Sequence, residues 1–275
     1  LTALTGCTGG TSSSTGETAS KAENSGNTAA SSSGDVIALA NVAETLGAGW
    51  NYGNTMEAVT NEMVSETAWG NPVVSQEMMN AVAEAGFKTV RVPVSYIGKI
   101  DDADSYKVDA AWLDRVEEVV GYCYTAGLNV IINVHGDGYN SIPGGWLLVN
   151  GDDQETIQAR YKALWTQISE KFASYDEHLI FESMNEVFDG IYHTPVAEYY
   201  ENINDYNRIF IDTVRSTGGN NTHRWLMAAG WNTDINYTCD GYGFRFPEDK
   251  LCTCGEGRLI LRSEEHTSEL QSLAY

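Results

Sequence analysis

The feature that most constrains the fold is an alternation, between residues 35 and 249, of short continuous apolar runs with amphipathic helical segments. The apolar runs are rich in β-branched and aromatic residues, and polar residues do not alternate within them. This pattern is typical of parallel strands that are buried on both faces. The runs are Leu46–Asn51, Lys88–Val94, Leu128–His135, Leu179–Asn185 and Trp225–Trp231.

The segments between these runs show the 3.6-residue period of helices with one apolar face. Leu113, Val116 and Val120, for example, share such a face. Gly86 and Gly127 stand where the first two helices should end, and glycine is the favoured residue just beyond a helix. Strict alternation of strands and helices predicts a parallel sheet.

A doubly wound sheet and an eight-stranded barrel both accommodate five such units. The chain contains neither a G-x-G-x-x-G turn nor a P-loop, which disfavours a nucleotide-binding sheet. Polar residues and Trp231 gather where the apolar runs end, and barrel enzymes build their active sites at that end of the strands. We therefore predict an α/β fold, an incomplete (β/α)8 TIM barrel with about five of the eight βα units.

The N-terminal region reads as an anchor and a tether. Leu4-Thr5-Gly6-Cys7 resembles a bacterial lipobox, so residues 1–7 are expected to be the remnant of a lipoprotein signal peptide, with Cys7 lipidated. Residues 8–34 are rich in Ser, Thr and Gly and carry no large apolar residue, which predicts a disordered linker. The expected location is extracellular or on the bacterial cell surface, with Cys7 as the only membrane attachment.

The C-terminal residues have a different origin. Arg262–Ser272 reads RSEEHTSELQS and matches the in-frame translation of a sequencing-library adapter at all eleven residues. The stretch before it has no clear periodicity, as expected of a lost reading frame. Residues 250–275 are therefore expected to be a frameshift and adapter artefact, and residues 251–275 are expected to lack packed structure. The partial barrel is expected to comprise residues 35–249.

Composition limits the partners. The formal net charge of -22 argues against binding to nucleic acid or to an anionic membrane surface, because both need clustered Lys and Arg. The chain contains no H-E-x-x-H, and His135 is the only strand-end residue of the type that ligates metals, so no metal or cofactor is expected. A monomer acting on a neutral substrate fits these observations.

Glu186 is the strongest catalytic candidate. Glycoside hydrolysis needs two carboxylates, one of which protonates the leaving oxygen. Glu186 ends an apolar run and follows Asn185, whose amide can bind a sugar hydroxyl. A lone Asn-Glu at a strand end also suits a helix cap or a surface pair, so this pair alone leaves both interpretations open.

Longer motifs extend the case. Taken together and in order, they resemble glycoside hydrolase family 5, most of all its branch of endoglucanases and xyloglucanases, from about Leu46 to Asp249. The motifs are GWNYGNT at 49–55, TAWGNP at 67–72, GFKTVRVPV at 86–94, VIINVHGDG at 130–138 and FESMNE at 181–186.

The resemblance implies a role for each strand-end residue. Glu186 would be the general acid/base, and Asn185 would bind the 2-hydroxyl of the sugar. Arg91 would orient the carboxylate of the nucleophile, and His135 would line the subsite of the distorted sugar. The sequence departs from the family pattern at Val187, where Pro is usual, and at Gly136, which often is a second His.

The family's nucleophilic Glu has no counterpart here. Glu256 lies in the artefact, and Glu182 is expected to be a buried structural carboxylate. The chain as it stands is therefore predicted to be inactive. Aromatic and amide side chains near the strand ends are expected to contact the sugars, with the loop 137–146 as a cleft wall. They are Trp50, Asn54, Trp69, Tyr139, Trp146, Tyr192 and Trp231.

The predicted function is that of a retaining endo-β-1,4-glycanase acting on glucan-type polysaccharides, a cellulase or endoglucanase. Mannanase, xylanase and xyloglucanase specificities stay open. Two other classes also remain: a metal-dependent barrel enzyme, and a non-catalytic carbohydrate-binding fragment that keeps the aromatic residues without the catalytic constellation.

Overall fold

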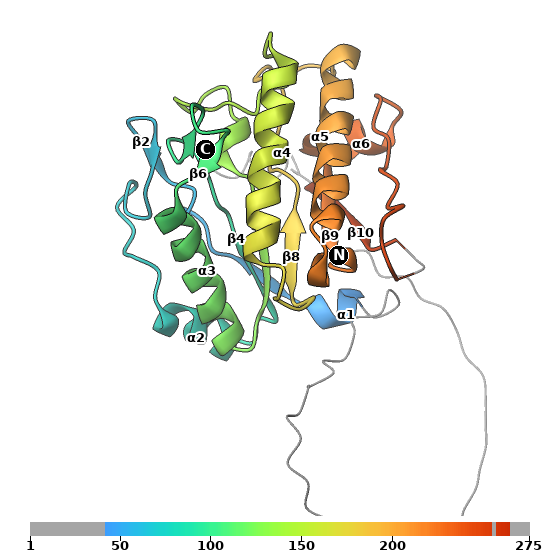
Figure 1. Ribbon diagram of the computed structural model, residues 1–275. Coiled ribbons are helices and arrows are strands. Elements are labelled where there is room, and N and C mark those ends of the chain that lie inside the picture. Colours follow the sequence, from blue (N-terminus) through green and yellow to red (C-terminus); the bar gives the residue numbers. More distant parts are fainter. Residues whose placement is uncertain (1–41, 255–256, 265–275) are drawn as a thin grey trace, which may run out of the picture. The chain divides into compact units, whose positions relative to one another are not determined.

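The computed structural model describes residues 42–254 and 257–264 (Figure 1). The expectations for residues 1–34, including lipidation of Cys7, lie outside these residues. Within them, one parallel sheet carries the helices and the long loops.

The sheet has six parallel strands in the order β1-β4-β7-β8-β9-β10. The five predicted strands are all confirmed, although each is shorter than or shifted from its apolar run, and Leu46 belongs to a helix instead. The bounds are β1 Gly49–Asn51, β4 Thr89–Val92, β7 Asn129–Asn133, β8 Leu179–Glu182, β9 Leu226–Asp234 and β10 Leu259–Glu264.

Strand β10 contradicts part of the expectation for the C-terminal residues, which held that 251–275 lack packed structure. Leu259 pairs with Leu226 and Arg262 with Ala229, in parallel register. The edge of β9 offers unpaired backbone groups, and the run Leu259–Leu261 has the apolar side chains that such an edge accepts. Strand pairing through the backbone says nothing about the origin of residues 250–275, which stays an expectation.

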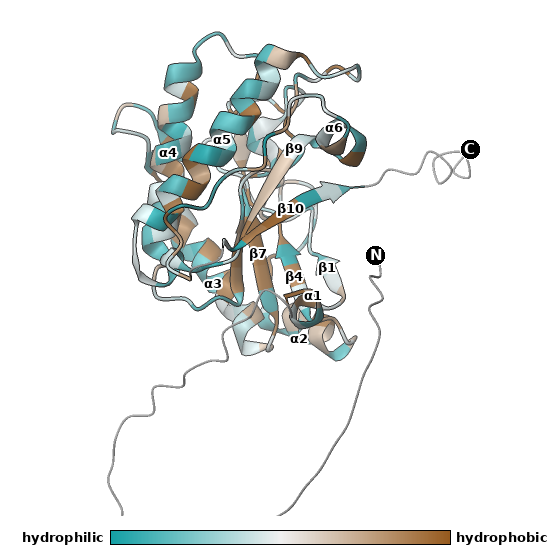
Figure 2. Ribbon diagram, turned by 90° about the vertical axis from the view of Figure 1, so that its right-hand side faces the viewer, coloured by the Kyte–Doolittle hydropathy of each residue, from teal (hydrophilic) through white to brown (hydrophobic). Residues whose placement is uncertain are grey.

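Helices α2 to α5 follow the strands as predicted and cover one face of the sheet, whereas α1 precedes β1 and packs on the other face (Figures 1 and 2). Gly86 and Gly127, just beyond α2 and α3, have φ of 92° and 73°, the left-handed region that favours glycine. The helices are α1 Val42–Leu46, α2 Gln76–Glu84, α3 Ala110–Thr125, α4 Gln154–Lys171, α5 Ala197–Ser216 and α6 Ile235–Cys239, with short 3-10 turns η2 Gly136–Gly138 and η3 Gly219–Thr222. Two small hairpins complete the list: β2 Val59–Thr60 with β3 Met63–Val64, and β5 Ile100–Asp101 with β6 Lys107–Val108.

Strand β7 shows how the two faces of the sheet are filled. Val130 and Ile132 pack into the large core between sheet and helices. Ile131, which points the other way, joins Ile180 and Trp225 in a second cluster against α1. Figure 2 shows the corresponding brown, apolar stretches of the strands. Both faces of the middle strands are thus apolar, which is why their sequences are continuous apolar runs.

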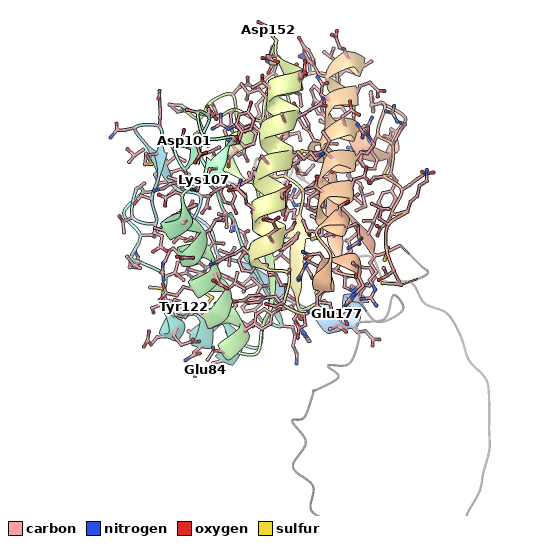
Figure 3. All side chains as sticks on the ribbon, in the orientation of Figure 1. Glu84, Asp101, Lys107, Tyr122, Asp152 and Glu177 are labelled. Atoms are coloured by element: carbon pink, nitrogen blue, oxygen red, sulfur yellow. The ribbon has the colours of Figure 1, made fainter. Side chains whose placement is uncertain are left out.

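The two ends of the sheet differ in what they carry. Asp101, in the hairpin strand β5, and Asp152, in the loop before α4, lie at the end toward which the strands of the sheet run, and Glu84, Tyr122 and Glu177 lie at the opposite end (Figure 3). In the described part of the chain, no helix is both long enough and apolar enough to span a membrane.

Candidate active site

The structure brings the four predicted strand-end residues together. Arg91 lies on β4, His135 just after β7, and Asn185 and Glu186 just after β8. They surround an open hollow of about 520 Å³. Its other lining residues are Asn51, Tyr139, Arg262, Ser263 and Glu264.

Arg91 is bound through side chains alone. Its Nε and Nη2 atoms donate to the two carboxylate oxygens of Glu182 at 2.7 and 2.8 Å. Nη2 also donates to Oδ1 of Asn185 at 2.7 Å, and Nη1 donates to Oδ1 of Asn51 at 2.7 Å. Within residues 42–254 and 257–264 these bonds use four of the five N–H donors of the guanidinium. One Nη1 donor is left for a further partner in the hollow.

Glu182 is the buried structural carboxylate that we expected. Its side chain is 0% exposed. Burial raises the pKa of a carboxyl group, but the charge and hydrogen bonds of Arg91 outweigh this effect and hold the pKa of Glu182 below its usual range. The carboxylate therefore anchors Arg91, and through Arg91 it orients Asn185.

His135 is neutral in this site. Burial, the positive charge of Arg91 and that of Arg262 lower the pKa of His135 to about 3, against a smaller raising effect of Glu182. The Asn133 amide donates to Nδ1 of His135 at 3.2 Å, and its own Oδ1 accepts from Val94 N, which sets the amide's orientation. Nδ1 is then the acceptor, so Nε2 carries the proton.

Glu186 has one hydrogen-bond donor among the described residues, and it is Tyr139. The phenol donates to Oε2 of Glu186 at 2.6 Å, and it accepts from Nδ2 of Asn185 at 2.6 Å. Burial and the hydrogen bond to the Glu186 carboxylate raise the pKa of Tyr139 well above its usual value, so the phenol keeps its proton. The sequence predicts Tyr139 as a sugar contact and contains no sign of its pairing with Glu186.

Asp137 holds the loop that carries Tyr139. Its carboxylate is 0% exposed and accepts from Nε1 of Trp146 at 2.7 Å and from the backbone N–H of Tyr96 at 3.0 Å. Burial raises the pKa of Asp137 to about 6. The backbone oxygen of Asp137 accepts from both Trp146 and Leu147, which closes the loop on itself.

Two of the predicted sugar contacts, Trp231 and Trp146, are buried. The prediction that they present an exposed ring to a sugar is therefore wrong. Trp231 is 1% exposed and packs on Tyr200, with ring centroids 5.8 Å apart. Trp146 is 8% exposed and lies between Asp137 and the Arg160 guanidinium, which is 4.6 Å from its ring. A strand-end aromatic residue fills either core or cleft, and sequence alone does not distinguish the two.

Of the other predicted sugar contacts, Tyr139 lines the hollow and the remaining four lie outside its lining. Trp50 is 49% exposed, but its neighbour Asn51 points at Arg91, so Trp50 faces the other side of the strand, beside Phe87. Asn51 is therefore the β1 residue that reaches the site. Because side chains alternate between the two faces of a strand, the sequence could have predicted Asn51 in place of Trp50. The remaining three are the exposed residues Asn54, Trp69 and Tyr192, which lie on loops.

Three residues of β10 also line the hollow, among them the charged residues Arg262 and Glu264. Nε of Arg262 is 2.9 Å from Oε1 of Glu182, and Arg262 also pairs with Glu264. Glu264 is thus a second carboxylate beside Glu186 in the lining. Both residues fall within the eleven that match the adapter translation.

No metal-binding group appears in the part of the chain that the structure describes: no cluster of three or more His, Cys, Asp or Glu is placed to hold an ion. The site is instead a set of carboxylates ordered by arginine, amide and phenol donors. Such an arrangement suits proton transfer and charge stabilisation at an acetal.

Fold and site together define a barrel enzyme with a carboxylate at the end of a strand, and comparison with known proteins agrees. Residues 51–254 match the family model described as cellulase, glycosyl hydrolase family 5. The chain belongs to glycosyl hydrolase family 5, and its sheet is part of that family's (β/α)8 barrel.

Individual relatives support the assignment. Endoglucanase A of Paenibacillus barcinonensis is 52% identical over 215 residues, which cover 78% of this chain and 54% of that protein. A xyloglucan-specific endo-beta-1,4-glucanase of Bacteroides ovatus is 40% identical over 196 residues, 68% of this chain and 38% of that protein. The chain thus spans about half or less of these relatives' length.

A solved structure is similar as well. The family 5 xyloglucanase from Paenibacillus pabuli, in complex with ligand, superposes with a TM-score of 0.81 at 52% identity. The match covers 82% of this chain and 64% of that one.

Proposed function

We propose that the full-length protein to which residues 35–249 belong is a retaining endo-β-1,4-glucanase with Glu186 as its general acid/base. The observation that carries the proposal is the position of the Glu186 carboxylate. It stands at the end of β8, half buried, beside Asn185 and facing the hollow that Arg91 and His135 also line. Family membership supports the same chemistry.

The reaction needs a second carboxylate that these residues do not supply. In the first step, an oxygen of that nucleophile attacks the anomeric carbon, the bond to the leaving oxygen breaks, and Glu186 gives its proton to that oxygen. In the second step, Glu186 takes a proton from water, whose oxygen attacks the same carbon and releases the nucleophile. Glu186 thus ends the cycle with its proton restored.

The neighbouring residues have roles that follow from their contacts. The free Nη1 donor of Arg91 is placed to bind the nucleophile's carboxylate and to favour its charged form. The Asn185 amide lies beside the acid/base, where a sugar 2-hydroxyl binds in this mechanism. Neutral His135 presents an N–H donor to the sugar without adding positive charge near the developing oxocarbenium ion.

The substrate is proposed to be a β-1,4-glucan, with xyloglucan as the first alternative, because relatives carry the names endoglucanase and xyloglucan-specific glucanase. Tyr192, 87% exposed in the loop after β8, and Trp69, 48% exposed, are proposed as outer sugar contacts. Initial rates on cellulose, mixed-linkage glucan, xyloglucan, mannan and xylan, measured at equal mass, decide the preference. Faster turnover of mannan or xylan would reject a glucan backbone.

Secretion and anchoring through Cys7 are proposed from the sequence motif. Expression of the full-length gene in a bacterium, with labelled palmitate, should place label on the protein. A Cys7→Ser variant should lose it and appear in the medium. Label retained by the variant would reject Cys7 as the acylated residue.

Residues 250–275 are proposed to be foreign to the enzyme, so Glu264 is not its nucleophile. The 275-residue chain should hydrolyse neither glucan nor an activated aryl β-glycoside. Glucan hydrolysis that disappears in a Glu264→Gln variant would contradict this proposal directly.

The acid/base assignment is tested in the full-length protein with Glu186→Gln. This change should reduce glucan hydrolysis by roughly three or more orders of magnitude, because the leaving oxygen is a poor one without a proton. Cleavage of a dinitrophenyl β-cellobioside, which needs no protonation, should lose far less in its first step. Glu170→Gln, on an exposed position of α4, is the matched control and should behave as wild type. Intact glucan hydrolysis by Glu186→Gln would reject the assignment.

A further inference from the structure

A continuous chain of hydrogen bonds runs from Glu182 at the bottom of the site to Glu186 at its mouth. Glu182 accepts from Arg91, and Arg91 Nη2 donates to Oδ1 of Asn185 at 2.7 Å. Nδ2 of Asn185 donates to the oxygen of Tyr139, and Tyr139 donates to Oε2 of Glu186, each at 2.6 Å. Strands β4 and β8, the segment that follows β8 and the loop that follows β7 contribute to this chain.

The donors and acceptors in this chain of hydrogen bonds follow one fixed direction, which Arg91 determines. A guanidinium has donors only, so the Asn185 atom that meets it must be the amide oxygen. The other amide atom of Asn185 is then the NH2 group, so the oxygen of Tyr139 must accept from it. A phenol has one proton, and Tyr139 can direct it only to Glu186.

This direction gives the two carboxyl oxygens of Glu186 different roles. Oε2 receives the Tyr139 proton in a hydrogen bond, so the carboxyl proton of Glu186 is directed to Oε1. Oε1 is then the atom that gives its proton to the leaving group. When Glu186 gives up that proton, the bond from Tyr139 becomes charge-assisted and roughly twice as strong, so it favours the transition state over the ground state.

We propose that Tyr139 is a positioning residue for the acid/base: its hydroxyl selects Oε1 of Glu186 as the proton-donating oxygen and stabilises the carboxylate left on Oε2. The proposal rests on Glu186 being the acid/base. It assigns to Tyr139 a function of its hydroxyl group, whereas a sugar platform would use only the ring.

The loop that carries Tyr139 is built to hold it still. Asp137, two residues earlier, is fixed by Trp146 and Tyr96, and the Tyr139 backbone N–H donates to Gly136 O at 3.2 Å. Gly138 leaves no room for a side chain, since an added Cβ would come within 2.5 Å of Val187, the residue after Glu186. The loop and the end of β8 therefore pack directly against each other.

Tyr139→Phe in the full-length protein is the test, because it removes the hydroxyl and keeps the ring. On a β-glucan, kcat should fall roughly 10- to 100-fold with KM within about twofold of wild type, the loss expected for one hydrogen bond to a charged group. The alkaline limb of the pH–rate profile should move up by about one pH unit, because the carboxylate form loses its donor. On the dinitrophenyl glycoside the first step should change less than about threefold.

Tyr122→Phe is the matched control. Tyr122 also donates to a glutamate, Oε1 of Glu118 at 2.7 Å, but it lies at the end of the sheet away from the site (Figure 3). This variant should keep the wild-type kcat, KM and pH profile. A structural effect of losing a tyrosine–glutamate bond would appear in both variants.

The outcomes separate the two proposals. If Glu186→Gln abolishes glucan hydrolysis but Tyr139→Phe matches wild type in kcat and pH profile, the role of Tyr139 is rejected and the acid/base stands. If Glu186→Gln leaves hydrolysis intact, the proposed function is rejected with it.

If the Tyr139→Phe protein folds poorly, a second experiment tests the proposal. Fluorotyrosines of graded acidity, incorporated at position 139, keep the shape of the side chain and strengthen the donor. The alkaline limb should shift to lower pH as the phenol becomes more acidic. A limb that does not move across the series would overturn the proposal.

Discussion

Two arginines lie at opposite ends of the sheet, and their guanidinium groups bind different kinds of partner. Arg224, just before β9, is 0% exposed and donates five hydrogen bonds, one to the Asn221 side chain and four to backbone carbonyls. Three of those carbonyls belong to the segment that follows α4, where a helix concentrates partial negative charge. Arg91 donates four bonds, all of them to side chains.

The difference separates structure from function. The backbone carbonyls that Arg224 binds are fixed in place by the fold. Arg224 therefore has a structural role at the amino-terminal end of the sheet. Its burial lowers its pKa to about 10, which still leaves it charged at neutral pH. The partners of Arg91 are a carboxylate and two amides, groups that orient a substrate or a neighbour, and one of its donors faces the hollow.

Replacing Arg91 should produce the largest change in activity. Arg91→Lys keeps the charge but offers a single ammonium, which cannot bridge Glu182, Asn185 and the nucleophile together. In the full-length protein kcat/KM on glucan should fall by about 1,000-fold. Arg208→Lys, on the exposed side of α5, is the control and should be neutral. A loss smaller than about tenfold would make Arg91 a structural residue like Arg224.

Replacing Arg224 should produce the largest change in stability. Arg224→Met fills similar space but removes one donor from each of four backbone carbonyls, so the free energy of unfolding of the 275-residue chain should fall by about 3–5 kcal/mol. Urea denaturation followed by tryptophan fluorescence measures it. Folded full-length Arg224→Met protein should retain wild-type kcat. A stability loss below about 1 kcal/mol would contradict the comparison.

The pH dependence of stability gives a smaller effect, centred on His135. Its folded pKa is about 3, below the value near 6.5 of an unfolded histidine. Between these values only the unfolded chain binds the proton, so the stabilisation is complete above about pH 6.5 and is lost as the pH falls toward 3.

Wild type should therefore lose about 1–2 kcal/mol more than His135→Gln between pH 7.5 and 4.5 in urea unfolding. Equal losses in the two proteins would show that His135 takes up a proton in the folded state. Its neutral role in the site would then be wrong.

Local pattern was enough to predict the strands and the residues at their ends. A parallel strand buried on both faces has a continuous apolar run, and polar residues near or just beyond the carboxyl end of the strand lie at the mouth of the barrel. This reasoning correctly grouped Arg91, His135, Asn185 and Glu186. It also predicted that Glu182, four residues before Glu186 and inside the strand, is buried.

What the pattern could not predict depends on loops. The contact between Tyr139 and Glu186 joins residues 47 positions apart through an irregular loop, which has no period to interpret. Trp146 and Trp231 were misplaced because a large aromatic side chain suits a core and a sugar platform equally well. Strand β10 was missed because residues 250–275 were interpreted as an artefact, and its apolar run is only three residues long.

Chemical rescue tests the central claim, that Glu186 is the acid/base of a retaining enzyme, most directly. Full-length Glu186→Gln should accumulate a glycosyl-enzyme on dinitrophenyl β-cellobioside, because no base activates water. Azide needs no base, so it should accelerate turnover and yield a β-cellobiosyl azide, identified by the anomeric proton coupling in NMR. An α-azide, or no acceleration by azide while glycosylation proceeds, would contradict the account.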